Sequence, residues 1–362
     1  MNTANKLNFF GITTLRAIAA TVVLIVHSSA LLSFNKEVSS FALLTNIGVD
    51  VFFVISGFII TYAHWNDFGT ATNGFITFIK KRLVRIYPMY FLFTIITAFA
   101  LLLMPQLFFS LKSSLSLLIS SLLFIPTQTE NGDVTLLLAV AWTLSYEMAF
   151  YVIFSVSLFL KRKIALPVIL SCIVIWSLLG TVSYDSFILS YFLTTLPLEF
   201  AFGMLICILF KSKREQQQTT TIQASILIFV SLLSLYLLCF KSNLIIDEIR
   251  GDYRFTYFGI PALFLFISLY NIPTPNSKFI KNIFEQIGNA SYVTYLSHFL
   301  TIGCIKFVMK KITFLQSIPL IITVLISCIL CTLVGIIIHK LIEAPTLNAL
   351  NRNPKGIFTF KH

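Results

Sequence analysis

The chain has 362 residues, of which 57% are hydrophobic and only 11% are charged. Because a soluble domain carries about 25% charged residues, this composition excludes an ordinary water-soluble protein. The formal net charge of +12 comes from short basic clusters between apolar runs, the pattern of cytoplasmic loops near anionic lipid, so membrane lipid and not nucleic acid is the expected partner.

Apolar runs of about 20 residues, the length that crosses ~30 Å of hydrocarbon, recur along the whole chain. The first run contains Arg16 and His27 and is longer than the roughly 7–15-residue core of a signal peptide, so we expect it to remain as a span. The apolar segment 115–125 is too short to cross comfortably. Ten spans are predicted, at 13–33, 46–64, 84–104, 139–160, 164–182, 187–210, 222–240, 254–272, 288–309 and 317–341.

The distribution of basic residues predicts on which side of the membrane each loop lies. With 115–125 on the outer side and the N-terminus inside, 18 of the 26 Lys and Arg residues face the cytoplasm, whereas only 12 do if this segment crosses. The bias therefore favours an all-α, polytopic bundle of about ten spans with both termini cytoplasmic. Residues 1–345 are expected to form one transmembrane domain, followed by a short cytoplasmic tail at 346–362. The six Cys residues lie in apolar stretches and are interpreted as packing residues, and no metal is expected.

Ionisable side chains inside spans are costly, so each one is a candidate for a functional site. Arg16 and His27 are separated on one helix by about three turns and about 16 Å of rise, so they project from one face at two depths. The alternative interpretation is a snorkelling arginine and a buried structural histidine.

Two carboxylates are predicted at the depth of His27. Asp50 lies little more than one turn inside the second span, and Glu147 about two turns inside the fourth. A carboxylate beside an imidazole fixes its tautomer and raises its basicity, which would make His27 a base. Asp50 as a cap at the membrane edge is the alternative. Trp142 and Tyr146 flank Glu147 and are candidate channel or acceptor contacts, while Tyr151 is interpreted as an interfacial anchor.

A basic cluster precedes the third span, where Arg82 and Arg85 are spaced i, i+3 and share a helix face. Together with Arg16 they would form a cationic patch suited to a phosphorylated ligand, although a plain positive-inside anchor is the alternative. Glu199 and His298 lie near mid-membrane and are expected either to pair with Arg16 or to line a channel.

These positions favour an enzyme that takes a phosphorylated donor from the cytoplasm and transfers a group toward the outside. A proton-coupled transporter is the competing class, because transporters also bury His, Asp and Glu. A non-catalytic membrane scaffold is a third alternative. Inverted repeats with paired broken helices would favour the transporter, and we recognise none in the sequence.

Six segments, in order, resemble the acyltransferase-3 family of bacterial membrane O-acyltransferases over nearly the whole chain. The first-span motif is LRAIAATVVLIVH, with Arg16 and His27 separated by ten residues. The other five are GVDVFFVISGFII (48–60), KRLVRIYPMYF (81–91), WTLSYEMAFY (142–151), EFAFGML (199–205) and SYVTYLSH (291–298). Thr143 stands where the family usually has Ser, and the C-terminal Glu-Lys/Arg-Pro motif appears as Glu343-Ala344-Pro345, to which we assign no role.

The resemblance implies a multi-pass protein of the bacterial inner membrane that moves an acyl group, usually acetyl, from acyl-coenzyme A to a hydroxyl of an extracytoplasmic polysaccharide. Lipopolysaccharide O-antigen, exopolysaccharide or a lipid-linked glycan are the expected acceptors, and acetyl-CoA or another acyl-CoA is the donor. Site residues are expected as follows: His27, Asp50 and Glu147 catalytic; Arg16, Arg82 and Arg85 donor-binding; Trp142, Tyr146, Glu199, Tyr295 and His298 as channel or acceptor contacts.

Overall fold

A computed structural model describes residues 9–34, 46–103, 114–128, 132, 134–212, 219–241 and 254–351. The chain in these ranges is almost entirely helical. Its main helices are α1 (Phe9–Leu32), α3 (Ile47–Ala63), α4 (Ala71–Leu103), α5 (Leu115–Leu122), α6 (Trp142–Ser157), α7 (Arg162–Leu179), α8 (Phe187–Phe192), α9 (Leu198–Ser212), α10 (Thr221–Lys241), α11 (Ile260–Leu269), α12 (Lys278–Lys311), α13 (Leu320–Ile338) and α14 (Ala344–Asn351). Short helical turns lie at η2 (Ala139–Ala141), η4 (Phe255–Gly259), η5 (Thr313–Ser317) and η6 (His339–Glu343), and β1 (Thr127–Gln128) pairs antiparallel with β2 (Val134–Thr135).

Six helices are long and apolar enough to cross a membrane, which confirms the all-α polytopic fold. They are Phe9–Leu32, Gly74–Leu103, Ala139–Ser157, Arg162–Leu179, Lys278–Lys311 and Leu320–Asn351. Three shorter apolar helices, at Ile47–Ala63, Thr221–Leu237 and Phe255–Leu269, accompany them.

Helix α13 shows how this fold distributes polarity. One stripe at a spacing of four residues is apolar and at least half exposed, at Ile321, Leu325, Ile329, Leu333 and Ile337. Its opposite side buries Ser327 and the free thiols of Cys328 and Cys331, and the Ser327 hydroxyl is 3.0 Å from that of Ser28 on α1. A continuous exposed apolar stripe is unfavourable in water and favourable in lipid, so this face of α13 is the lipid-facing one.

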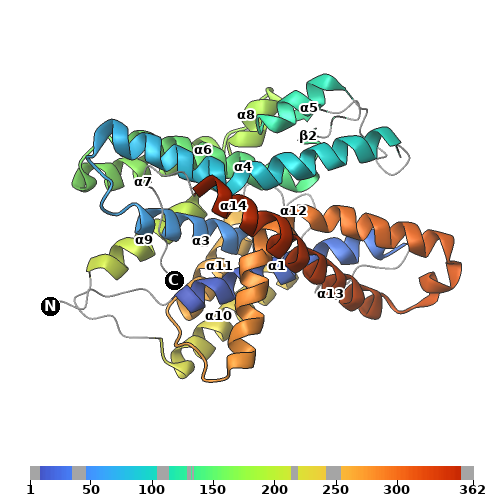
Figure 1. Ribbon diagram of the computed structural model, residues 1–362. Helices are drawn as coiled ribbons and strands as arrows, with labels where there is room; N and C mark the ends of the chain where they lie inside the picture. Colours follow the sequence, from blue (N-terminus) through green and yellow to red (C-terminus); the bar gives the residue numbers. More distant parts are fainter. Residues whose placement is uncertain are drawn as a thin grey trace.

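The helices form two groups, as Figure 1 shows. Helices α4, α6 and α7 pack together along one side, and α1, α12 and α13 pack against one another along the other. Helices α3 and α9 form a tight pair, and α14 contacts α4 where the two groups meet. Helix α1 contacts α3, α11, α12 and α13, so its polar residues lie at the centre of the bundle.

Two glycines allow α3 and α9 to approach closely. A Cβ at Gly57 would collide with the carbonyl oxygen of Phe200, and one at Gly203 with that of Val54. Small residues at such crossings are a general device of membrane helix pairs, because backbone contact replaces side-chain packing. The crossing places the start of α9, with Glu199, beside the buried face of α3.

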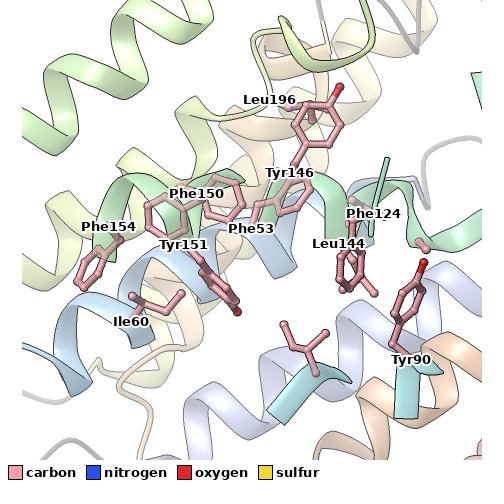
Figure 2. Packing of buried hydrophobic residues seen from close by; sticks show 14 of the residues in the cluster. Phe53, Ile60, Tyr90, Phe124, Leu144, Tyr146, Phe150, Tyr151, Phe154 and Leu196 are labelled. Atoms are coloured by element: carbon pink, nitrogen blue, oxygen red, sulfur yellow. The ribbon is translucent and has the colours of Figure 1, made fainter. Parts of the chain in front are cut away.

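An aromatic core joins the α3–α9 pair to α6. The Phe150 and Phe200 rings stack with centroids 4.4 Å apart, and the Phe53 ring lies 4.8 Å from that of Phe200. Figure 2 shows Phe53, Tyr146 and Phe150 gathered at this point. This rigid packing sets the position of α6 and of the carboxylate it carries.

The structure differs from the predicted spans in three places. The span expected at 187–210 is two helices, α8 and α9, because Pro197 has no N–H and its ring disfavours the helical conformation at the preceding residue. Helix α12 begins at Lys278 rather than at 288, and α4 begins at Ala71 rather than at 84. The segment 115–125 forms the eight-residue α5, about 12 Å long and too short to cross. The expected tail 346–362 begins within α14, and its residues 352–362 lie outside the described ranges.

Candidate active site

Two histidines from distant parts of the chain face each other inside the bundle. Nε2 of His298 on α12 lies 2.8 Å from Nδ1 of His27 on α1, and the rings are nearly parallel at 24°. His298 is fully buried, and its Nδ1 lies 2.5 Å from the backbone carbonyl oxygen of Tyr295. The Phe299 ring packs 4.8 Å from that of His27. Neither histidine forms a hydrogen bond with Arg16 in the part of the chain that the structure describes.

Asp50 does not orient His27. It is fully buried in the first turn of α3. Arg254 donates two hydrogen bonds to its carboxylate, from Nε to Oδ1 at 3.1 Å and from Nη2 to Oδ2 at 2.7 Å. The prediction compared the depths of Asp50 and His27 but not the rotation of α3, which turns the carboxylate toward η4. Sequence reasoning missed Arg254 because this residue stood at the first position of the span expected at 254–272; a cation placed within a predicted span was the available signal.

Glu199 lies beside this ion pair rather than beside Arg16. Its side chain is fully buried and interacts with Asp50, and neither of its carboxyl oxygens has a hydrogen-bond donor among the described residues. Gly259, at the end of the π-helical turn η4, leaves the space that this carboxyl occupies. Helix segments with such a widened turn recur at functional sites, because the extra residue redirects side chains.

A second ionic group lies between α4 and the end of α13. Arg85 donates from Nη1 to Oε1 of Glu343 at 2.7 Å, and the other oxygen, Oε2, is 2.6 Å from Nδ1 of His339. Glu343 is fully buried, although the sequence assigned it no role because Ala344 replaced the neighbouring cation. His339, one turn earlier in the π-helical turn η6, was the signal that could have indicated a buried acid–base pair.

Arg16 lies near this group without joining it. Its charge interacts with those of Arg85, Glu343 and Glu147, yet its guanidinium forms no hydrogen bond or ion pair with the residues that the structure describes. Its side chain is only partly buried. The charges of Arg16 and Arg85 thus interact, and among the described residues none accepts a hydrogen bond from the Arg16 guanidinium.

Glu147 and Arg82 complete the cluster. Oε1 of Glu147 accepts hydrogen bonds from the Ser56 hydroxyl at 2.9 Å and the Tyr151 hydroxyl at 2.5 Å. The Arg82 guanidinium lies 5.8 Å from the Tyr151 ring centroid, and its Nε is buried without a described acceptor. Glu147 therefore belongs to the arginine group and forms no described hydrogen bond with His27. Tyr151 is buried, so its interpretation as an interfacial anchor is wrong.

The remaining aromatic candidates have structural partners. The Tyr295 hydroxyl lies 2.9 Å from that of Thr143 and donates to the carbonyl of Val140 at 2.8 Å, and the Tyr146 hydroxyl donates to the carbonyl of Tyr191. Figure 2 shows the Tyr146 and Tyr151 hydroxyls pointing to opposite sides of α6. Trp142 is partly exposed, and its ring lies 5.8 Å from the Arg254 guanidinium.

The site thus has a basic group around Arg16, Arg82 and Arg85 and, farther along α1, the His27–His298 pair. Arginine guanidinium groups suit phosphate, and a neutral imidazole pair suits proton transfer. One continuous helix connects the two groups, since α1 carries both Arg16 and His27.

The comparisons with known proteins identify the family of the chain. The sequence model of the acyltransferase-3 family, described as "Acyltransferase domain", matches residues 9–340. The exopolysaccharide production protein ExoZ of Rhizobium meliloti (strain 1021) is 29% identical over 303 residues, which cover 83% of this chain and 89% of that protein. Protein 2 in the picA locus of Rhizobium radiobacter is 38% identical over 80 residues, covering 22% of this chain and 38% of that protein. No solved structure matches the chain. Because the family match extends over nearly the whole helical bundle, the chain is a multi-pass membrane protein that belongs to the acyltransferase-3 family.

Proposed function

We propose that the protein transfers an acyl group, acetyl foremost, from cytoplasmic acyl-coenzyme A to a hydroxyl of an extracytoplasmic polysaccharide. The observation that carries the proposal is the arrangement on α1. A partly exposed arginine, which has no hydrogen-bond partner among the described residues, and a paired histidine are separated there by about three turns and about 16 Å. Membership of an acyltransferase family supplies the reaction class.

The donor end of the site is assigned to the basic group. Coenzyme A carries phosphates, and guanidinium groups bind phosphate through paired, charge-assisted hydrogen bonds. The Arg16 guanidinium donates no hydrogen bond to a described residue, whereas Arg85 is held in place by Glu343. The thioester arm then extends along α1 toward His27, so that the acyl carbon reaches the histidine pair while the phosphates stay with the arginines.

The acceptor end of the site is assigned to His27. As a general base it takes the proton of the acceptor hydroxyl while that oxygen attacks the thioester carbon. Transient attachment of the acyl group to His27 is the alternative role. The similarity to a protein named for exopolysaccharide production supports exopolysaccharide as the acceptor class, and the cytoplasmic membrane of a bacterium is the proposed location.

The test uses inside-out membrane vesicles that contain the protein and its host polysaccharide. Acetyl-coenzyme A labelled in the acetyl group is added outside, and we expect alkali-labile label on the polysaccharide. Label should be absent with His27→Ala at an equal protein level and present with Arg162→Gln, a surface arginine that contacts Trp65. Passage of polysaccharide or donor without any covalent change would instead identify a transporter. A scaffold predicts that His27→Ala and Glu147→Ala change nothing.

A further inference from the structure

The hydrogen bonds of the His27–His298 pair have a defined direction. The carbonyl oxygen of Tyr295 can only accept, so Nδ1 of His298 must donate to it at 2.5 Å. A neutral imidazole has a single N–H, and a fully buried imidazole without a carboxylate partner is neutral at rest. Nε2 of His298 therefore carries a lone pair and accepts, at 2.8 Å, the proton on Nδ1 of His27.

This direction determines the reactive atom of His27. With its proton on Nδ1, the lone pair of His27 lies on Nε2, the nitrogen that does not face His298. We propose that His298 is a positioning residue that holds His27 in this tautomer and presents Nε2 as the base, an inference that rests on the proposed acyl transfer.

The carboxylates that usually perform this orienting role have other partners. The Asp50 carboxylate accepts from Arg254, and the Glu147 carboxylate accepts from Ser56 and Tyr151. A second imidazole in that place has a physical advantage inside a membrane. It accepts the hydrogen bond without placing a permanent charge in the apolar interior, where an isolated ion is costly.

The acceptor hydroxyl gives its proton to Nε2 of His27, its oxygen forms a bond to the acyl carbon, and the carbon–sulfur bond of the thioester breaks. The proton on Nε2 then passes to the departing thiolate, which leaves as free coenzyme A. While His27 is an imidazolium, its Nδ1–H remains hydrogen-bonded to the lone pair on Nε2 of His298, which spreads the positive charge over both rings.

Three substitutions separate orientation from packing. His298→Phe keeps a flat ring beside His27 but removes the acceptor, His298→Ala removes both, and in His298→Gln the side-chain oxygen can still accept from Nδ1 of His27. We expect Phe and Ala to lower kcat by about 100-fold, the loss typical of an orienting partner, with the donor KM unchanged within a factor of about two. The kcat of His298→Gln should be at least about tenfold higher than that of His298→Phe.

Ser327→Ala is the matched control. It removes a buried hydrogen bond to Ser28, the neighbour of His27 on α1, without touching either imidazole, and should leave kcat near the wild-type value. Wild-type kcat in His298→Phe, or equal losses with Gln and Phe, would overturn the proposal.

A second measurement does not depend on acyl transfer. The chain has five His residues, so nitrogen-15 NMR of histidine-labelled protein in nanodiscs can be assigned with single variants. We expect His27 to be protonated on Nδ1 and bare on Nε2, and to shift toward the opposite tautomer in His298→Phe. A proton on Nε2 of His27 in the wild type would refute the proposed role of His298, even if the enzyme is active. An inactive wild type with the expected tautomer counts only against the proposed function.

Discussion

Arg85 on α4 and Glu343 at the end of η6 form an ion pair of 2.7 Å although 258 positions separate them in the sequence. The pair connects the α4 group of helices to α13, and Glu343 also holds His339. It therefore positions one arginine of the proposed donor site, whereas the Arg16 guanidinium has no hydrogen-bond partner among the described residues.

The Arg85–Glu343 pair predicts strong energetic coupling. Arg85→Gln and Glu343→Gln should each destabilise the protein, by about 1–3 kcal/mol because the arginine is one-third exposed and partly screened. The double variant should lose less than the sum, since each single change leaves a buried partner unpaired. Thermal unfolding in detergent measures this. Glu285→Gln, which breaks the exposed pair with Lys281, is the control and should cost less than about 0.5 kcal/mol. Additive losses at Arg85 and Glu343 would contradict the coupling.

Arg16 is predicted to affect donor binding rather than the stability of the protein. Because its guanidinium has no hydrogen bond with the described residues, Arg16→Ala should leave the melting temperature nearly unchanged. Donor affinity should fall roughly 10- to 100-fold, because a hydrogen bond to a charged group is worth about 1.5–3 kcal/mol. Calorimetric titration with acetyl-coenzyme A measures the affinity, with Arg162→Gln as the control. An unstable protein with normal donor affinity would make Arg16 a structural residue.

Asp50 is predicted to act in folding rather than in catalysis. Asp50→Ala leaves the buried guanidinium of Arg254 without its carboxylate and should cost about 3–5 kcal/mol. Replacing both residues, as in Asp50→Leu with Arg254→Met, should recover much of that loss because no charge remains buried. Stability is followed by thermal unfolding, and kcat is measured per folded protein. A folded Asp50→Asn protein with kcat lowered by more than about 100-fold would restore the catalytic role that its sequence position suggested.

Glu199→Gln should stabilise the protein. The carboxyl of Glu199 has no described hydrogen-bond donor and lies next to that of Asp50, so two buried acids share one arginine. An amide at this position can donate to Asp50 and removes one acidic group, a gain of about 1 kcal/mol. Thermal unfolding at neutral pH checks the sign, with Glu199→Ala as the comparison that supplies no donor. A lower melting temperature for Glu199→Gln would mean that the acidic form of this side chain is needed.

Much of the protein could be predicted from its sequence. Apolar runs predicted a polytopic helical bundle, because the length and hydrophobicity of a span depend only on local composition. The motif around Arg16 and His27 indicated the family, and their separation along α1 follows from helical rise alone.

The tertiary structure decided which side chains meet. Depth in a span constrains one coordinate, whereas contact also depends on how each helix is rotated and which neighbour it packs against. His27 therefore faces His298 and not Asp50, and Asp50 faces Arg254. The role of Glu343 was hidden for the same reason, because its partner lies on another helix. The sequence by itself determined that charged residues are buried in a membrane enzyme, and only the packing of the helices determined how those charges are paired.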